Sequence, residues 1–136
     1  MSKRVPKPRP GQFKLLGKSG VSAPTALLEV FETPASISHV IMRSDEVTAV
    51  CPVTGQPDQY TVEIRYTPDK FCIESKSLKL KLQSYRNVGM FCEALAANIL
   101  KHVVESISPK AAAVEITQKS RGGVAIIATA DYLEGD

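Results

Sequence analysis

The feature that most constrains the fold is a change in the spacing of apolar residues along the chain. Residues Gln59–Thr67 alternate between apolar and polar side chains, which predicts a half-buried strand. Over Glu74–Asn87 and Met90–Ile107 apolar residues recur at helical intervals, and strand-like segments return at Ala112–Thr117 and Val124–Ala130. The order of hairpin, two helices and hairpin predicts an α+β fold, with an antiparallel four-stranded sheet and both helices on one face.

The other strand of the first hairpin is predicted at Val47–Cys51, which the turn-forming stretch Pro52–Asp58 joins to the alternating segment. Upstream of it, Thr25–Phe31 is compatible with a short strand. A sheet of this kind leaves the backbone N–H and C=O groups of its edge strands unpaired. We therefore expect the domain to assemble by edge pairing into a ring.

A length of 136 residues allows one domain with a single core. Residues 1–24 are rich in Pro, Gly, Lys and Ser, which predicts a poorly ordered basic arm before a single domain over residues 25–136. The arm lacks the apolar stretch of a secretory signal, and no apolar run approaches the roughly 18 residues that span a bilayer. We expect a cytoplasmic protein without membrane contact. Because the net charge is only +3, the basic run is interpreted as a solvated tail, and no direct nucleic-acid partner is expected.

The three cysteines, Cys51, Cys72 and Cys92, are an odd number without CxxC spacing, which argues against a disulfide scaffold and against a zinc site. Cys72 lies between two apolar residues and is expected in the core. Cys51 is the candidate nucleophile, because it closes a strand and opens a proline-flanked turn that would hold its thiol at the rim of the sheet. The ordinary alternative is a buried cysteine that acts as a small apolar residue.

Asp58 lies across the same turn, where its carboxylate could exchange protons with a reacting nitrogen. An anion at that distance would raise the pKa of the Cys51 thiol. A thiolate at neutral pH therefore requires a nearby cation or helix N-terminus, and the sequence alone identifies neither.

Two segments carry groups that suit phosphates. The predicted helix that starts at Glu74 places Lys76 and Lys79 on neighbouring turns, although a capped amphipathic helix with a solvated face has the same pattern. In the second hairpin, Arg121 could fork onto a phosphate and Gly122 would permit a close backbone approach. A plain hairpin turn is the simpler interpretation of that pair.

Glu93 follows Cys92 near the start of the second predicted helix, where the helix dipole favours a carboxylate. A carboxylate could equally clamp the ring N–H and the exocyclic amine of a guanine-like base, since two donors match two oxygens. Residue patterns do not choose between these roles. Cys92 could also form a disulfide with Cys51 if their Cα atoms lie within about 7 Å.

Taken together, these motifs resemble the single-module nitrile reductases of queuosine biosynthesis, which belong to the tunnelling-fold superfamily together with GTP cyclohydrolase I. The resemblance covers residues 45–130 and rests on Cys51-Pro-Val-Thr-Gly-Gln-Pro-Asp58, Glu74-Ser-Lys-Ser-Leu-Lys-Leu80, Ser84-Tyr-Arg-Asn87, Phe91-Cys-Glu93 and Arg121-Gly-Gly123. The chain departs from the family at two positions. Cys92 stands where the family normally has His, and Lys81 stands where an aromatic residue usually ends the lysine motif.

The resemblance implies a tunnelling fold, a ring of subunits, pentameric or decameric, with active sites between subunits, and NADPH-dependent reduction of the nitrile of 7-cyano-7-deazaguanine to an aminomethyl group. Cys51 would add to the nitrile carbon to give a thioimide, while Asp58 supplies and removes protons and NADPH donates hydride. The resemblance further implies that the substrate is bound by Glu74, Ser75, Glu93 and Cys92. It implies that the cofactor is bound by Lys76, Lys79, Arg121 and Gly122. The NADPH assignment rests on the resemblance, because the sequence has no GxGxxG fingerprint.

Two other functions remain open at this stage. A tunnelling-fold amidinotransferase also forms a thioimide from a deazapurine nitrile, but passes it ammonia and acts on modified tRNA. Relatives of that type lack the serine–lysine motif that this chain has at Glu74–Leu80, which favours the reductase. A ring-forming binding module without catalysis is suggested by the absent His.

Overall fold

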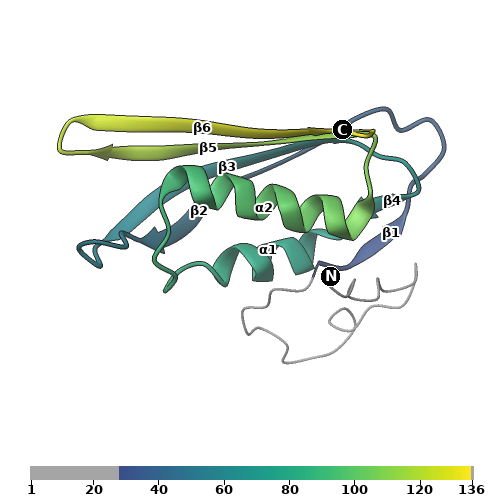
Figure 1. Ribbon diagram of the computed structural model, residues 1–136. Coiled ribbons are helices and arrows are strands. Elements are labelled where there is room, and N and C mark those ends of the chain that lie inside the picture. The colour runs from purple at the N-terminus through teal and green to yellow at the C-terminus, as the bar shows by residue number, and fades with distance from the viewer. Residues whose placement is uncertain (1–27, 136) are drawn as a thin grey trace, which may run out of the picture.

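The computed structural model describes residues 28–135, which form a four-stranded antiparallel sheet with two helices packed on one face (Figure 1). Within the sheet the strand order is β2-β3-β5-β6, and a two-stranded ribbon, β1-β4, lies beside it. The strands are β1 (Val30–Glu32), β2 (Val40–Val50), β3 (Pro57–Thr67), β4 (Phe71–Ile73), β5 (Ala111–Arg121) and β6 (Val124–Leu133). The helices are α1 (Ser75–Gln83) and α2 (Cys92–Ile107).

The α+β class, the four-stranded sheet and the position of both helices on one face are confirmed, but several predicted boundaries are wrong. Strand β2 begins at Val40, before the predicted Val47. The prediction was too short because a bulge between Ser44 and Val47 interrupts the alternation that marks a strand. The short ribbon strand β4 was not predicted at all. The predicted arm over residues 1–24 and the start of the predicted strand at Thr25 lie outside the described residues.

Helix α1 is shorter than predicted at its C-terminal end, and α2 starts two residues later than predicted. Glu74 caps α1, and turns occupy the residues that follow Gln83. Helix α2 ends at a left-handed cap residue, Ser108, directly before Pro109, which cannot continue a helix. Among the described helices, none is both long and apolar enough to cross a bilayer.

The core lies between the sheet and α2. Apolar residues at four-residue intervals place one face of α2 on the sheet, where Leu95, Ile99, Val103 and Ile107 are at most 2% exposed. They pack against the inward-facing side chains of the strands, which belong to the same cluster of buried residues. Burial of each such side chain stabilises the fold by roughly 1.5–3 kcal/mol.

Three connecting segments, the β2–β3 turn, the β5–β6 hairpin and the α1–α2 connection, lie at one end of the molecule together with the first turn of α2 (Figure 1). The α1–α2 connection is held there by backbone hydrogen bonds from Val50 N to Val88 O and from Met90 N to Val50 O, both 3.1 Å. The first turn of α1 lies at the other end, beside the ribbon, where Glu74 N donates to Glu29 O at 2.9 Å.

Candidate active site

Cys51 sits at the end of β2 in a turn that its own backbone closes. Its N–H donates to Gln56 O and its carbonyl accepts from Gly55 N, each at 2.8 Å. Gly55 has a φ of 71°, a left-handed value that favours glycine and lets the chain reverse within this turn. The Cys51 side chain is 5% exposed, yet it is not part of the apolar core that contains Cys72 and Cys92. Cys51 is thus a buried cysteine at the end of β2 that lies outside the main cluster of core residues.

Hydrogen bonds to the Cys51 sulfur favour its thiolate form. They come first from the side chain of Thr54, then from the backbone of that residue, and then from the guanidinium of Arg121. Together they lower the pKa of Cys51 from 9.0 to about 6, against the opposing effect of burial. The cation that the sequence left unidentified is Arg121.

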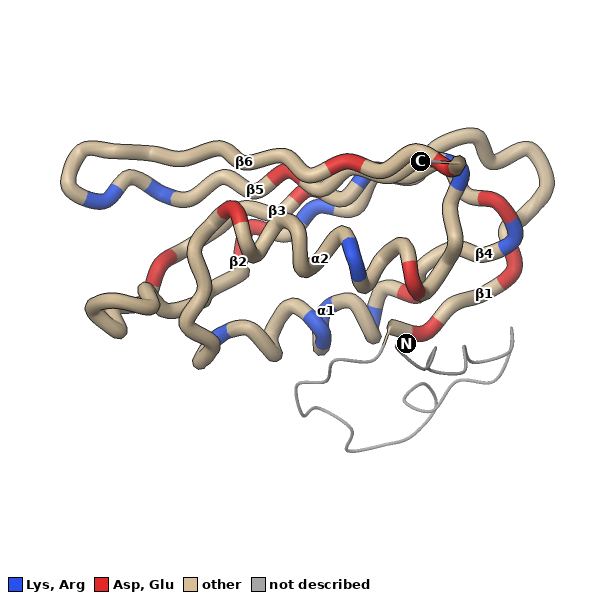
Figure 2. The backbone as a smooth tube through the Cα atoms, viewed as in Figure 1, with Lys and Arg blue, Asp and Glu red and all other residues tan. Residues whose placement is uncertain are grey.

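Arg121 joins Cys51, the predicted nucleophile, to Asp58, the predicted acid–base residue. Its Nη1 lies 3.3 Å from Asp58 Oδ1, and the Asp58 side chain is 7% exposed. Gly122 and Gly123, which follow it, both have positive φ, so the hairpin reverses directly after the arginine. Figure 2 shows this basic end of β5 at the same end of the molecule as the acidic positions that begin β3 and α2. One guanidinium therefore offsets the charge of both a thiolate and a carboxylate.

Two buried groups lie next to this cluster, Tyr60 and Cys92. Tyr60 follows Asp58 on the same face of β3, and burial, with the nearby charge of Asp58, raises the pKa of its phenol to about 12. Burial, followed by the charge of Glu93, raises the pKa of the Cys92 thiol. Cys92 is therefore a neutral thiol at neutral pH, and all three cysteines are free.

Glu93 is exposed in the first turn of α2, at the end of the molecule where Cys51 and Asp58 lie. Its position on the helix agrees with the predicted stabilisation by the helix dipole. Its carboxylate faces solvent and is available to a ligand at this rim.

The structure does not bring the lysine motif to Cys51 within one chain. Glu74 uses both carboxylate oxygens to cap α1, accepting from Lys76 N and Ser77 N at 2.7 Å each. The nine residues of α1, about 13 Å of helix at 1.5 Å per residue, separate this cap from the α1–α2 connection beside β2. Ser75 and Lys79 are exposed, and Lys76 is half-buried.

Sequence reasoning missed two residues of the cluster, Thr54 and Tyr60. Thr54 stands three residues after Cys51 in a tight turn, where a threonine hydroxyl commonly bonds to a neighbouring group, so its presence was a usable signal. Tyr60 lies on the apolar face of the alternating segment Gln59–Thr67 and is 1% exposed. The same alternation places it beside Asp58, two residues earlier, which was a usable signal for its position in the cluster.

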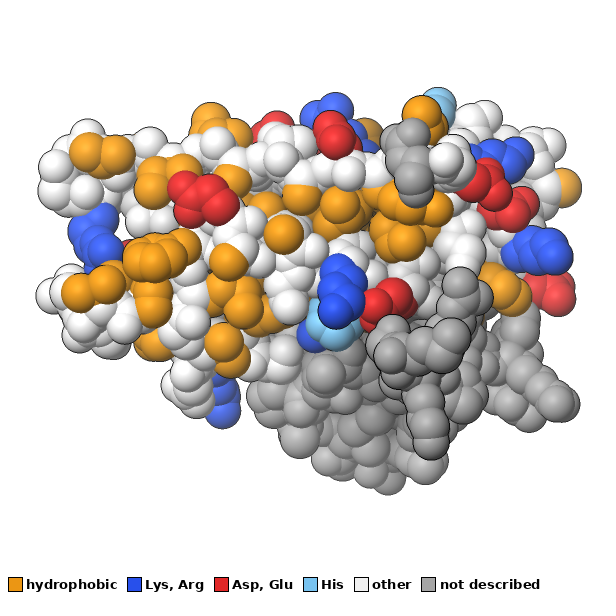
Figure 3. All heavy atoms as spheres, in the orientation of Figure 1, with side chains coloured by type: hydrophobic (Ala, Val, Ile, Leu, Met, Phe, Trp, Pro, Cys, Tyr) orange, Lys and Arg blue, Asp and Glu red, His pale blue; other side chains and the backbone are white. Residues whose placement is uncertain are grey.

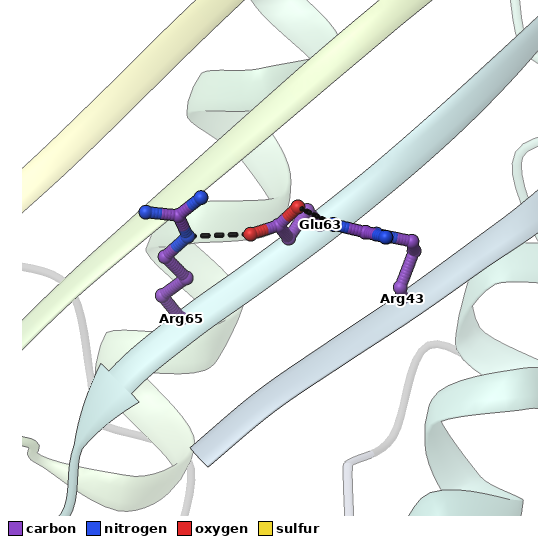
Figure 4. Close-up of polar contacts among 3 residues, drawn as sticks. All are labelled: Arg43, Glu63 and Arg65. Atoms are coloured by element: carbon purple, nitrogen blue, oxygen red, sulfur yellow. Dashed lines mark hydrogen bonds and ion pairs between the residues drawn. The ribbon is translucent and has the colours of Figure 1, made fainter. Parts of the chain in front are cut away.

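A second charged cluster lies on the sheet face opposite the helices. Glu63 of β3 accepts from Arg43 of β2 at 2.6 Å and from Arg65 at 2.5 Å, as Figure 4 shows. These hydrogen bonds, that of Arg43 first, lower the pKa of Glu63. The cluster includes no nucleophile, and the hollow beside it measures only ≈ 60 Å³. Its contacts join neighbouring positions of the sheet, so its role is structural.

Exposed apolar side chains surround the end of the molecule where Cys51 lies. They are Val53 in the turn after Cys51, Val88 and Phe91 in the α1–α2 connection, and Val124 after the hairpin glycines, with exposures of 79%, 38%, 55% and 62%. Figure 3 shows hydrophobic side chains gathered over this end of the visible face. We call these four residues the apolar rim.

Comparison with known proteins places the chain in a family. Residues 57–135 match a family model described as QueF-like protein. The chain belongs to the QueF-like family. It is 41% identical over 111 residues to the NADPH-dependent 7-cyano-7-deazaguanine reductase of Chlorobium phaeobacteroides, covering 80% of this chain and 94% of that protein. The enzyme of the same name from Syntrophus aciditrophicus is also 41% identical, over 97% of this chain and 94% of its own length.

A crystal structure of the archaeosine synthase QueF-Like in its apo form has the same fold, with a TM-score of 0.67 at 25% identity. The match covers 71% of this chain and 94% of that one. The predicted tunnelling-fold architecture is therefore confirmed. Cys51 precedes the residues that the family model matches, and the Syntrophus relative covers nearly the whole chain.

Proposed function

We propose that this protein is an NADPH-dependent reductase that converts the nitrile of 7-cyano-7-deazaguanine to an aminomethyl group. The names of the relatives at 41% identity support the activity. The observation that carries the chemistry is the placement of Cys51, Arg121 and Asp58 in one contact cluster, because a thiolate beside a proton-exchanging group is what addition to a nitrile requires.

The reaction begins at the Cys51 sulfur, which is ionised at neutral pH. The thiolate attacks the nitrile carbon, so that a carbon–sulfur bond forms and one π bond of the C≡N group breaks. The electron pair of that bond moves to the nitrogen, which takes up a proton to give a neutral thioimide. Arg121 stays beside both groups, and it loses its thiolate partner as the sulfur becomes neutral.

Asp58 exchanges protons with that nitrogen during the addition and the later reduction steps. Its 7% exposure keeps bulk water away from the exchange. Glu93 binds the ring N–H and exocyclic amine of the deazaguanine, and the apolar rim covers the faces of the base. Cys92 lines the site as a neutral thiol, while Glu74 and Ser75 are placed to act on a neighbouring subunit's substrate.

The residues predicted to bind NADPH fit its phosphates. Lys79 is exposed and Lys76 half-exposed on one side of α1, and a side chain at Gly122 would meet nothing within 4 Å, which leaves its backbone open to a ligand. Bound NADPH supplies the hydride for reduction. The structure gives Arg121 a different primary role, on Cys51 and Asp58, so Lys76 and Lys79 carry more of the phosphate binding than predicted.

A complete site needs two protomers, because α1 separates its lysines from Cys51 within one chain. Assembly into a ring, a pentamer or decamer, places the start of α1 of one subunit beside the Cys51 end of the next. The apolar rim is covered in this assembly. The described residues belong to a single catalytic domain, and the protein acts in the cytoplasm without membrane or direct nucleic-acid partners.

The test is oxidation of NADPH, followed by its absorbance, in the presence of 7-cyano-7-deazaguanine. The wild-type protein should oxidise NADPH only when the nitrile is present, and Cys51→Ala should abolish the reaction. Cys72→Ala is the matched control, because Cys72 is a core thiol and should retain activity. No nitrile-dependent oxidation by the wild-type protein would refute the proposal.

A second candidate is a synthase of the archaeosine type, which the likeness to the archaeosine synthase structure supports. It is the weaker candidate because that likeness has 25% identity, against 41% for the reductases. A protein adduct with the nitrile that forms and persists in the presence of NADPH, without hydride transfer, would favour it.

A further inference from the structure

Three buried tyrosines pack in the described domain, and their hydroxyl groups differ. Tyr66 accepts a hydrogen bond from Ile73 N at 3.0 Å, and Tyr85 donates one to Asn98 Oδ1 at 2.7 Å. The hydroxyl of Tyr60, a residue that is 1% exposed, has no hydrogen-bond partner among residues 28–135. Buried hydroxyls in native proteins are nearly always bonded, because leaving one unsatisfied costs free energy that a phenylalanine would not cost.

Tyr60 lies on an inner strand of the sheet, near the end that carries the reactive groups. In the register of the sheet it lies opposite Val47 on β2 and Gln118 on β5. It shares a face of β3 with Asp58, two residues earlier. Its phenol is also within electrostatic range of Cys92, Arg121 and Cys51. The unsatisfied hydroxyl therefore belongs to the candidate site rather than to a distant part of the core.

We propose that the Tyr60 hydroxyl donates a hydrogen bond to the nitrile nitrogen as Cys51 adds to the carbon. This inference rests on the proposed reductase function and adds a residue to it. In the addition step the electron pair of the broken π bond develops on that nitrogen, and a donor already aimed at it stabilises the charge before a proton arrives. Tyr60 keeps its own proton throughout, and the proton that the nitrogen gains comes by way of Asp58.

Among the groups at the site, Tyr60 is the one suited to this role. Its pKa of about 12 keeps the phenol protonated at neutral pH. Cys92 is a neutral thiol, which is a weak donor, and Arg121 already serves Cys51 and Asp58.

The experiment compares Tyr60→Phe with Tyr66→Phe, which removes a hydroxyl from the same strand at a position of similar burial. Both variants are assayed for nitrile-dependent NADPH oxidation, for the rate of adduct formation with the nitrile alone, and for thermal unfolding. We expect Tyr60→Phe to lose about 10²-fold in kcat and in adduct formation, the usual effect of removing one such donor. Its melting temperature should equal or exceed that of the wild type. Tyr66→Phe should show the opposite pattern, with a lowered melting temperature and near-normal kcat.

Each outcome decides the proposal. A Tyr60→Phe protein as active as the wild type would overturn it while leaving the reductase function intact, and so would losses of activity and stability that match those of Tyr66→Phe. If Tyr60→Phe does not fold, Tyr60→His is the second variant, because it retains an N–H donor and should keep part of the rate of adduct formation. A folded Tyr60→His protein that forms no adduct would refute the role of Tyr60 as a hydrogen-bond donor. A wild-type protein without nitrile-dependent oxidation would remove the proposed function, and this inference with it.

Discussion

The pH dependence of Cys51 labelling tests whether hydrogen bonds to the sulfur lower the pKa of this thiol. Replacement of Thr54 by valine removes the hydroxyl that contributes most to lowering the pKa of Cys51, which is about 6 in the intact protein. An acid with a lowered pKa is ionised above that value and protonated below it, so wild-type labelling should rise with pH through about 6 and then level off. The variant's rise should occur at higher pH.

The expected difference in labelling rate between the wild type and the variant depends on the pH at which they are compared. At about pH 7 a thiol with a pKa of about 6 is roughly 90% thiolate, against about 3% for an ordinary thiol with a pKa of about 8.5. The more acidic thiolate is also intrinsically slower, by about tenfold for a Brønsted slope of about 0.45, so the net advantage at neutral pH is only about threefold. At about pH 5.5 the thiolate ratio exceeds about 200, and the net advantage is about 20-fold if all the lowering is lost.

The assay is labelling with iodoacetamide across this pH range, read by intact-protein mass spectrometry with Cys51→Ala as the blank. Thr61→Val, which removes a hydroxyl from β3, is the matched control and should follow the wild type. The largest loss for Thr54→Val should appear on the acid side, with little change near neutrality. A wild-type midpoint above about pH 8, the range of an unperturbed thiol, would contradict a lowered pKa for Cys51. Superimposable profiles for the wild type and Thr54→Val would contradict the role of the Thr54 hydroxyl.

Two further predictions concern assembly and stability. Cys51→Ala and Lys79→Met should each be strongly impaired when assayed alone. When the two variants are unfolded and refolded together in equal amounts, about a quarter of the sites should oxidise NADPH, because each site draws on two subunits. A mixture no more active than its components would contradict the shared site. Leu95→Ala, at a fully buried position of α2, should lower the free energy of unfolding in urea by about 2–5 kcal/mol. The exposed Ala94→Ser should change it by less than about 0.5 kcal/mol, and similar losses for both would contradict the placement of the core.

The sequence was most informative where one periodicity runs uninterrupted. The alternation of β3 and the helical spacing of α2 are strong signals because each element buries one face, and both were predicted within two residues at each end. Strand β2 was predicted too short because its bulge carries Asp45 and Glu46, which break the alternation. Strand β4 has only three residues, and its pairing with β1 depends on tertiary contacts.

The candidate site was predicted only where its residues are close in the sequence. Cys51 and Asp58 lie in one local turn, so their proximity follows from the sequence. The contact with Arg121 does not, since it joins residues about seventy positions apart and depends on the β3–β5 register. Glu74 was assigned to the substrate, whereas its carboxylate caps α1; its role toward a ligand remains a prediction. Within residues 28–135 the Tyr60 hydroxyl has no partner, and this is a property of packing that residue patterns do not encode.

The guanidinium contact also links chemical reactivity to completion of the chain. Arg121 is made long after Cys51 during synthesis, and it reaches the sulfur only when β5 has paired with β3. A polypeptide in which β5 has not yet paired with β3 lacks the contribution of Arg121 to the thiolate, while the larger contributions of Thr54 come from the turn that follows Cys51. Formation of the second hairpin therefore completes the electrostatic environment of Cys51, which the local turn has already begun.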